Sequence, residues 1–165
     1  MNLQPILEDE LIILRPIKQE DFDDLFEAAS DPEIWEQHPN KDRYKREEFE
    51  KYFVGAIESK GALVVIDKLT GDVIGCSRYY DYDKERKRVA IGWTFLVKRC
   101  WGGKYNRSLK KLMMDNAFED FEEIIFHIGE NNIRSRKAVE KIGGKLLDED
   151  YEEEGHVVYG IRKRD

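Results

Sequence analysis

The sequence predicts a single α/β domain. The chain has 165 residues, enough for one buried core and too few for two ordinary domains. Short apolar runs predict strands, and segments with apolar residues three and four apart predict helices. The two kinds of segment follow one another in the order βααβββαβαββ across residues 1–165, without a linker, repeat or low-complexity tract. An antiparallel first half that leads into a β-α-β crossover is typical of an α/β domain.

The first third of the chain predicts one strand and two helices. Residues 11–16 are an apolar run closed by Pro16, which predicts a short strand. Residues 21–29 carry apolar side chains at helical spacing, with acidic residues in the first turn. Residues 33–43 have no clean period and predict a loop or a short helical turn. A second helix is marked by Phe49, Tyr52, Phe53, Ala56 and Ile57.

The middle of the chain predicts two hairpins and a helix. Residues 62–66 and 73–80 are strand-like and are joined by a connection that contains Gly71. The chain turns again at 83–86 and returns as a strand over 89–97. The helix that follows has an apolar side formed by Tyr105, Leu109, Leu112, Met113 and Ala117.

The last third predicts a central strand, a helix and a strand pair. Residues 124–128 are almost all apolar, which indicates a strand covered on both faces. Ala138, Val139 and Ile142 form the buried side of a helix that ends at residues 143–144, both glycine. Strands are expected over 146–151 and 157–162, with a turn at 152–155.

Composition and charge exclude several classes of protein. A net charge of −7 disfavours a general nucleic-acid binder and suits a cationic partner better. The longest apolar runs are far shorter than the roughly 18 to 20 residues that cross a bilayer, so no contact with a membrane is expected. The N-terminus has neither a basic start nor an apolar signal core. We therefore expect a cytoplasmic protein.

Cysteine and histidine spacing predicts no metal site. Cys76 and Cys100 are the only cysteines and form no CxxC motif. Cys76 lies in an apolar pattern and is expected in the core. Cys100 has no cation at recognisable spacing that would activate it as a nucleophile. Residue His127, in an apolar run, is expected to be a core histidine rather than a base.

Two polar corners, each between a strand and a helix, predict a cofactor cleft. The first, residues 99–106, contains Gly102 and Gly103 directly before a helix. Adjacent glycines let a ligand approach the backbone, and the N–H groups at a helix start lack intrahelical partners. Such a corner binds anions, above all phosphates. The second, residues 130–136, again follows a strand and opens a helix.

The chain resembles the GCN5-related N-acetyltransferases, and within them the ribosomal-protein N-terminal acetyltransferase-like branch. The resemblance covers nearly the whole length and is strongest at residues 99–106 and at Asn132-x-x-Ser135 followed by Glu140-Lys141-Ile142-Gly143. Weaker matches occur, in the same order as in the family, at residues 11–16, 20–22, 30–33, 71–75 and 91–93.

The resemblance implies a mixed central sheet of about six or seven strands flanked by about four helices, with acetyl-CoA bound where two parallel central strands splay apart. It implies that the pantetheine arm pairs with the backbone of Phe95, Leu96 and Val97. It implies that the pyrophosphate is held by the N–H groups of Gly102, Gly103, Lys104, Tyr105 and Asn106, with charge added by Arg99 or Lys104. Asn132 would bond the pantetheine amides, and Ser135 would lie near the sulfur.

The chain departs from the family pattern at three positions. Lys104 takes the last small position of the phosphate loop. Val139 stands where many members carry a tyrosine that acts as general acid. Ala90 stands where many relatives carry a glutamate. The last two departures put a side-chain acid and a direct carboxylate base in doubt, although orientation and oxyanion stabilisation by backbone groups tolerate their loss.

Several site residues have two interpretations. Ser135 could protonate or hydrogen-bond the coenzyme sulfur, or it could be a polar residue in a first helical turn. Asn132 is expected to combine helix capping with cofactor contact. The acceptor side could be lined by Trp35, Tyr79, Tyr80 and Trp93, which could equally be core residues, and the core is favoured for Trp93.

The predicted activity is acetyl transfer from acetyl-CoA to a primary amine by direct attack in a ternary complex. The alternative is a catalytically weak acetyl-CoA sensor or interaction module of the same fold. A P-loop enzyme is discounted because no Gly-Lys-Ser/Thr follows the glycines. The acceptor stays open between a protein N-terminus, an aminoglycoside, a polyamine and a small metabolite. A homodimer is a further expectation, since dimers are frequent among relatives.

Overall fold

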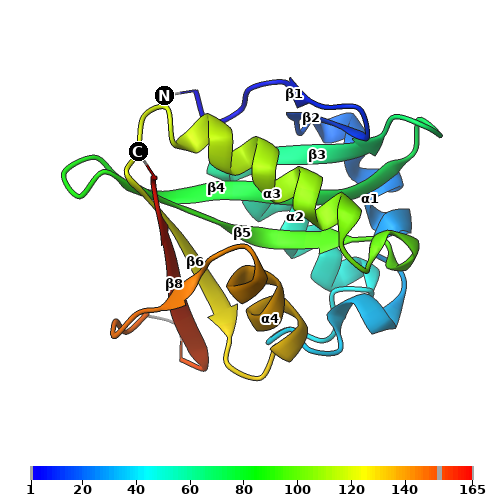
Figure 1. Ribbon diagram of the computed structural model, residues 1–165. Helices are drawn as coiled ribbons and strands as arrows, with labels where there is room; N and C mark the ends of the chain where they lie inside the picture. Colours follow the sequence, from blue (N-terminus) through cyan, green and yellow to red (C-terminus); the bar gives the residue numbers. More distant parts are fainter. Residues whose placement is uncertain (1, 152–153, 165) are drawn as a thin grey trace.

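The chain folds around one eight-stranded mixed sheet (Figure 1). The computed structural model describes residues 2–151 and 154–164. The strand order is β1-β2-β3-β4-β5-β6-β8-β7. The strands are β1 (Leu7–Glu8), β2 (Ile12–Pro16), β3 (Ala62–Asp67), β4 (Val73–Asp83), β5 (Arg88–Leu96), β6 (Glu123–Gly129), β7 (Lys145–Leu146) and β8 (His156–Arg162). The helices are α1 (Phe22–Ala28), α2 (Arg46–Ser59), α3 (Lys104–Ala117) and α4 (Ile133–Lys141), with short 3-10 turns η1 (Gln19–Asp21), η2 (Pro32–Trp35) and η3 (Lys98–Cys100). The expected α/β fold is confirmed.

The central strands β5 and β6 are parallel and separate after a short paired stretch. Their pairing runs from Arg88 opposite Glu123 to Ala90 opposite Ile125 and then stops. Beyond it β5 stays on β4 and β6 stays on β8, so the two halves of the sheet diverge, and α4 lies over the opening (Figure 1). The splayed pair is therefore present in this chain.

A bulge in β5 lies inside this opening. The register between β4 and β5 shifts between Cys76 and Arg78, and Trp93 adopts a positive φ of 53°. A non-glycine residue at positive φ is strained and needs support from its surroundings. The hydroxyl of Tyr52 in α2 supplies it by donating a hydrogen bond to the carbonyl of Trp93. The bulge is thus held in place from the α2 side of the sheet.

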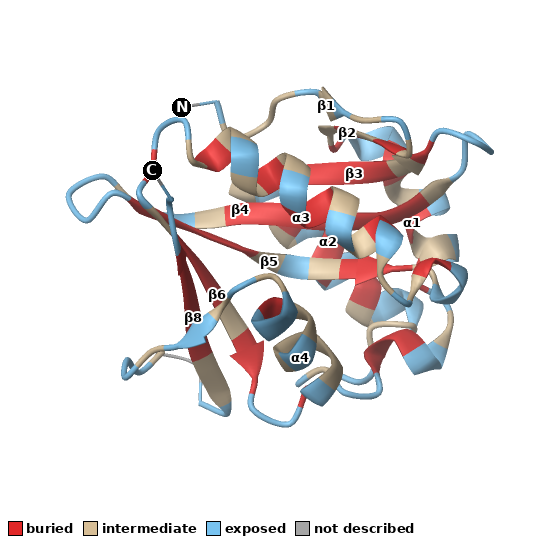
Figure 2. Cartoon of the chain, viewed as in Figure 1, coloured by how far each residue is buried: buried red, intermediate tan, exposed pale blue. Residues whose placement is uncertain are grey.

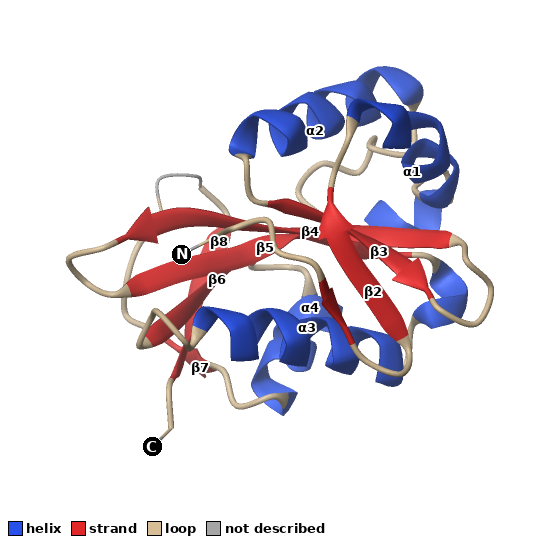
Figure 3. Cartoon of the chain, turned by 90° about the horizontal axis from the view of Figure 1, so that it is seen from above, coloured by secondary structure: helices blue, strands red, loops and turns tan. Residues whose placement is uncertain are grey.

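Helices cover both faces of the sheet, α1 and α2 on one and α3 and α4 on the other (Figure 3). On the α3 face, Leu109 and Met113 pack against Ile91 of β5 in the larger buried cluster. On the α2 face, Phe49 packs with Phe95 in a second cluster. Figure 2 shows buried residues concentrated on the central strands and on the inward sides of these helices. The periodic apolar side chains predicted to be buried therefore form two layers of core.

Two strands differ from those expected from the sequence, and one expected turn falls partly outside the described residues. The first strand, β1, was not predicted, because two residues carry no readable period. The strand expected over 146–151 is wrong in extent, since β7 covers only Lys145–Leu146. The turn expected at 152–155 falls partly on residues 152 and 153, which lie outside the described residues. Cys76 is fully buried, as expected.

Among the described residues, no helix is both long and apolar enough to span a bilayer.

Candidate active site

A cavity of about 820 Å³ lies in the opening between β5 and β6. Its walls include β5 from Ile91 to Leu96, β6 from Phe126 to Gly129, and residues of α3 and α4. One end reaches the turn at Gly102, and the other reaches the loop before α2 and the side chain of Tyr80. The cavity thus connects the anion-binding corner with the opposite face of the sheet.

The turn before α3 has the geometry of an anion site. Gly102 and Gly103 adopt φ values of 101° and 132°, which side chains with a Cβ rarely take. No atom lies within 4 Å of the position a Cβ would occupy on Gly102, so its backbone is open to a ligand. The N–H groups in the first turn of α3 have no intrahelical acceptor. Gly102, Gly103, Asn106 and Arg107 line the cavity, so these groups lie where an anion would bind.

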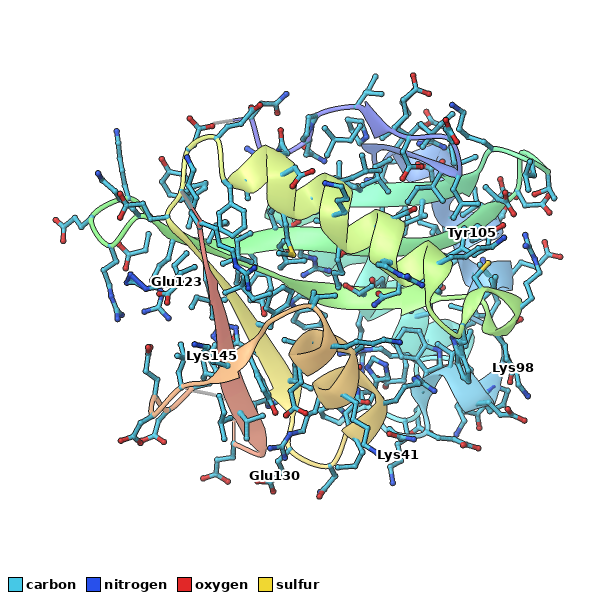
Figure 4. The ribbon with its side chains drawn as sticks, in the orientation of Figure 1. Lys41, Lys98, Tyr105, Glu123, Glu130 and Lys145 are labelled. Carbon is cyan, nitrogen blue, oxygen red and sulfur yellow. The ribbon has the colours of Figure 1, made fainter. Side chains whose placement is uncertain are left out.

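Three residues expected to bind phosphate do not line the cavity. The Arg99 guanidinium lies 3.0 Å from a carboxylate oxygen of Asp67, at the end of β3. The hydroxyl of Tyr105, labelled in Figure 4 on α3, donates to the same oxygen at 3.0 Å. Lys104 is exposed outside the cavity. Arg99 is thus held by a buried acid that sequence proximity does not reveal, and the expectation that Arg99 or Lys104 adds charge at the phosphates stays a prediction.

Two of the three residues expected to pair with pantetheine through their backbone, Leu96 at the end of β5 and Val97 just after it, already have hydrogen-bond partners for one backbone group each. The amide of Val97 donates to the carbonyl of Ile74 on β4 at 2.8 Å, and Val97 does not line the cavity. The carbonyl of Leu96 accepts a hydrogen bond from the indole Nε1 of Trp101 at 3.0 Å. Phe95 and Leu96 line the cavity. Phe95 and Leu96 thus belong to the part of β5, from Ile91 to Leu96, that lines the cavity.

Trp101 and Arg134 join the two predicted corners. The guanidinium carbon of Arg134 lies 3.9 Å from the centroid of the Trp101 ring. The same guanidinium donates a hydrogen bond to the carbonyl of Ile34 at 3.2 Å. Sequence reasoning missed this pair, although both residues lie inside the motifs it singled out.

The start of α4 is capped as predicted. The Asn132 side chain accepts a hydrogen bond from the amide of Ser135 at 3.2 Å and is only 3% exposed. Asn132 and Ser135 both line the cavity, as does Val139 one turn further along α4. The structure thus brings the two predicted catalytic residues together at one wall.

The acceptor side of the cavity contains a hydrogen-bonded aromatic cluster. The hydroxyl of Tyr80 lies 2.9 Å from Nδ1 of His127, and His127 stacks on Tyr151 with 3.8 Å between ring centroids. Burial lowers the pKa of His127. The residue is half-buried and lines the cavity, so the expectation of a core histidine is corrected.

Of the other aromatic residues expected here, Trp93 lies at the cavity and two do not. Trp93 is 37% exposed and lines the cavity, so its expected place in the core is wrong. Trp35 is buried, with its indole donating to the carbonyl of Ala29 at 2.9 Å. Tyr79 is buried on the α3 side, where its hydroxyl donates to the carbonyl of Met113. Neither Trp35 nor Tyr79 lines the cavity, because each side chain satisfies its polar atom inside the core.

The charged side chains that line the cavity are basic. Among the described residues they are Arg43, Arg107, Lys110, Arg134, Lys137 and Lys141, with no carboxylate. The whole chain carries a net charge of −7, so this concentration of positive charge is local. It favours an anionic ligand.

Lys110 of α3 is the buried member of this set. It is 7% exposed, and burial lowers its pKa to about 8. Its ammonium donates to the Thr94 hydroxyl at 3.0 Å, and that hydroxyl lies 2.8 Å from the Ser77 hydroxyl. Sequence reasoning missed Lys110, which carries no signal apart from its helical position near Leu109 and Met113.

Metal or thiolate chemistry has little support in this geometry. In the part of the chain that the structure describes, no group of three or more His, Cys, Asp or Glu side chains could hold a metal ion. Cys100 lines the cavity, but burial raises the pKa of its thiol. A raised pKa leaves less of the nucleophilic thiolate.

Comparison with known proteins identifies the family. Residues 12–145 match the model of the acetyltransferase (GNAT) domain. The chain therefore belongs to the GNAT acetyltransferase family, whose members transfer acetyl groups from acetyl-CoA. No curated protein sequence matches the chain.

Solved structures show the same fold at low sequence identity. A GCN5-related N-acetyltransferase from Brucella melitensis is 21% identical with a TM-score of 0.84, over 96% of this chain and 79% of that one. An acetyltransferase from Agrobacterium tumefaciens str. C58 is 21% identical with a TM-score of 0.78, over 96% and 95%. A putative ribosomal-protein-serine acetyltransferase from Vibrio cholerae is 12% identical with a TM-score of 0.71, over 99% and 100%.

Proposed function

We propose that this protein is an acetyl-CoA-dependent N-acetyltransferase whose acceptor amine attacks the thioester directly in a ternary complex. The observation that carries the proposal is the cavity between β5 and β6, which runs from an open glycine turn to a hydrogen-bonded histidine. An anion site at one end and a proton acceptor at the other suit acetyl transfer from a phosphorylated carrier to an amine.

The residues at the cavity fit acetyl-CoA. The amides of Gly102, Gly103 and Asn106 and the Arg107 side chain would hold the phosphates, and Phe95 and Asn132 would contact the pantetheine arm. When bound, acetyl-CoA supplies an activated acetyl group. The open space above Gly102 and the basic lining of the cavity both support this fit.

On the acceptor side, His127 is our proposed base. An amine attacks only in its neutral form and loses a proton as the amide forms. A histidine with a lowered pKa is neutral at neutral pH and can accept that proton. Tyr80 fixes the orientation of the ring through Nδ1, and Trp93 forms the adjoining wall. This arrangement offers a base without the glutamate that Ala90 replaces.

The acceptor class follows from charge and similarity. A basic cavity repels polyamines and aminoglycosides, so we propose a small-molecule amine of low positive charge or a protein N-terminus. The similarity to the Vibrio cholerae protein and the sequence resemblance support the ribosomal-protein N-terminal branch and make N-terminal peptides the first acceptors to test. We propose a homodimer on the same resemblance, and a cytoplasmic location on the sequence features described above.

The proposal is tested by calorimetry with acetyl-CoA and by release of free coenzyme thiol with a panel of acceptors. The panel contains N-terminal peptides, amino acids, polyamines and aminoglycosides. We expect binding and turnover with an acceptor of low charge, and loss of turnover but not of binding in His127→Gln. Absence of acetyl-CoA binding would refute the proposal.

A sensor or interaction module is the second candidate. Val139 is buried at the cavity wall where relatives carry an acidic hydroxyl, which favours weak catalysis. Acetyl-CoA binding without turnover on any acceptor of the panel would support this alternative.

A further inference from the structure

Lys110 is buried without an anionic partner among the described residues that line the cavity. The Thr94 hydroxyl is the hydrogen-bond acceptor of its ammonium among the described residues, and no carboxylate lines the same cavity. A buried ammonium with one neutral partner lowers stability, because desolvation is not compensated. Such groups are enriched at functional sites.

The ammonium lies where β5 and β6 begin to separate. Thr94 belongs to β5, just after the bulge at Trp93, and the Phe126 ring of β6 has its centroid 5.8 Å from the Lys110 nitrogen. Phe126 directly follows Ile125, which makes the last β5–β6 pair with Ala90. Lys110 therefore contacts both walls of the opening. Its ammonium has three N–H donors, of which Thr94 takes one.

Among the described residues, the α4 wall of the cavity offers no efficient proton donor. Val139 of α4 has no proton to give, and Ser135, one turn earlier, offers only a weakly acidic hydroxyl. A proton donor near the sulfur assists departure of the thiolate, typically by about 10²–10⁴-fold. Lys110 is the buried proton donor that lies on the α3 wall of the cavity.

We propose that Lys110 is a catalytic residue that protonates the sulfur of the departing coenzyme A thiolate. An N–H bond of the ammonium breaks, an S–H bond of coenzyme A forms, and Lys110 is left as a neutral amine that water reprotonates. The proton lost by the acceptor amine goes to His127 and then to solvent. This role rests on the proposed acetyltransferase function and adds to it a general acid supplied by α3.

The electrostatic surroundings suit this step. Among the described residues, several further titratable groups line the cavity. They are His38 and Arg43 from the loop before α2, Tyr80, His127 and His156 from the strands, Cys100 from η3, Arg107 from α3, Arg134, Lys137 and Lys141 from α4, and Tyr151 from the segment before β8. Burial brings the pKa of Lys110 to about 8, near the range in which a general acid works best. A bound polyanion opposes this shift, so Lys110 stays protonated at neutral pH until the thiolate forms.

The test uses Lys110→Met, Lys110→Arg and Thr94→Val, with Lys111→Met as control. Lys111 is exposed and pairs with Asp115 at 2.7 Å, so its loss removes a neighbouring positive charge outside the cavity. We expect Lys110→Met to lower kcat about 10²–10⁴-fold with little change in KM for acetyl-CoA. Lys110→Arg keeps the charge but is too weak an acid, so it should lower kcat similarly. Lys111→Met should match the wild type.

A second readout does not depend on turnover. The ultraviolet absorbance of the thiolate reports the pKa of coenzyme A bound to the protein. A nearby ammonium lowers that pKa, so we expect it to rise by about one unit or more in Lys110→Met and to stay low in Lys110→Arg. In Thr94→Val, which leaves the ammonium in place, the thiol pKa should stay low and kcat should fall less than in Lys110→Met.

The outcomes separate the two proposals. A wild-type protein that turns over, with unchanged kcat and thiol pKa in Lys110→Met, would overturn the role of Lys110 alone. Full rescue of kcat by Lys110→Arg would overturn proton donation, since charge alone would then suffice. A wild-type protein that does not bind acetyl-CoA would overturn the proposed function and this role with it.

Discussion

The guanidinium of Arg99 pairs with the carboxylate of Asp67 across the base of the glycine turn, at 3.0 Å. The Asp67 side chain is only 1% exposed, and its oxygens also accept hydrogen bonds from the Tyr105 hydroxyl and the Leu69 amide, each at 3.0 Å. These bonds lower the pKa of Asp67. The turn that lines the cavity is therefore anchored to the end of β3 by side chains that point away from the cavity.

Replacing Arg99 should affect stability more than ligand affinity. Arg99→Ala leaves a buried carboxylate without its cation, and we expect the free energy of unfolding to fall by about 1–3 kcal/mol. This loss is smaller than that expected for a fully buried ion pair, because Arg99 is half exposed and solvent screens its charge. Because the pKa of Asp67 is lowered in the folded state, wild-type stability from this group is present above its ordinary pKa and is lost as pH falls. Urea unfolding across the acidic range measures both effects. Acetyl-CoA affinity that collapsed without loss of stability would contradict this reading.

Replacing Arg107 should affect ligand affinity more than stability. Arg107 lines the cavity beside Gly103, with a guanidinium nitrogen 3.1 Å from the position of a Cβ there. We expect Arg107→Ala to weaken acetyl-CoA binding about 5- to 10-fold, as loss of one exposed charged hydrogen bond does, while stability changes little. Acetyl-pantetheine, which lacks the nucleotide phosphates, should bind the variant and the wild type equally in calorimetry. An equal loss for both ligands would place Arg107 away from the phosphates.

The contrast between Arg99 and Arg107 shows what the sequence could predict. The glycine turn and the Asn132 cap depend on local backbone chemistry, so residue type and spacing revealed them. The direction of the Arg99 side chain depends on Asp67, a distant residue in the chain, and local spacing carries no information about it. Lys110 was missed for the same reason, since its burial and its bond to Thr94 exist only once β5 and α3 are packed.

Asn132 should contribute separately to capping and to ligand binding. Asn132→Ala removes the acceptor for the Ser135 amide and should lower stability by about 1 kcal/mol, together with acetyl-CoA affinity. Asn132→Asp keeps a capping oxygen but replaces the amide donor with a negative charge. This variant should keep its thermal stability and still lose affinity. Wild-type affinity in Asn132→Asp would show that Asn132 acts only as a cap.

His38 should make the fold sensitive to acid. Burial, together with the charges of Arg43 and Arg134, lowers its pKa from 6.5 to about 4. As the pH falls below about 6.5, His38 takes up a proton in the unfolded chain but not yet in the folded chain. The stability that this group contributes is therefore fully present above pH 6.5 and is lost as the pH falls toward 4. The total loss is at most about 3.5 kcal/mol, at about 1.4 kcal/mol per pKa unit. His38→Gln should remove this part of the acid dependence in urea unfolding, and an unchanged acid profile would contradict the assignment.

Lys110 should lower stability near neutral pH, as expected for a group kept for function. Its pKa falls from 10.5 to about 8, so below pH 8 the folded protein carries a poorly solvated charge that the unfolded chain solvates freely. Between about pH 8 and pH 10.5, Lys110 is protonated more often in the unfolded chain than in the folded one. Wild-type stability therefore rises with pH through this window. Lys110→Met should therefore be more stable than the wild type at neutral pH. The gain is at most about 3.5 kcal/mol, reduced by the contribution of the Thr94 hydrogen bond that the variant loses. The advantage should shrink as pH approaches 10.5. Urea unfolding of the wild type and Lys110→Met at several pH values measures the difference in stability, with Lys111→Met as the exposed control. If the stability gain of Lys110→Met did not change with pH, Lys110 would not be titrating in a buried site.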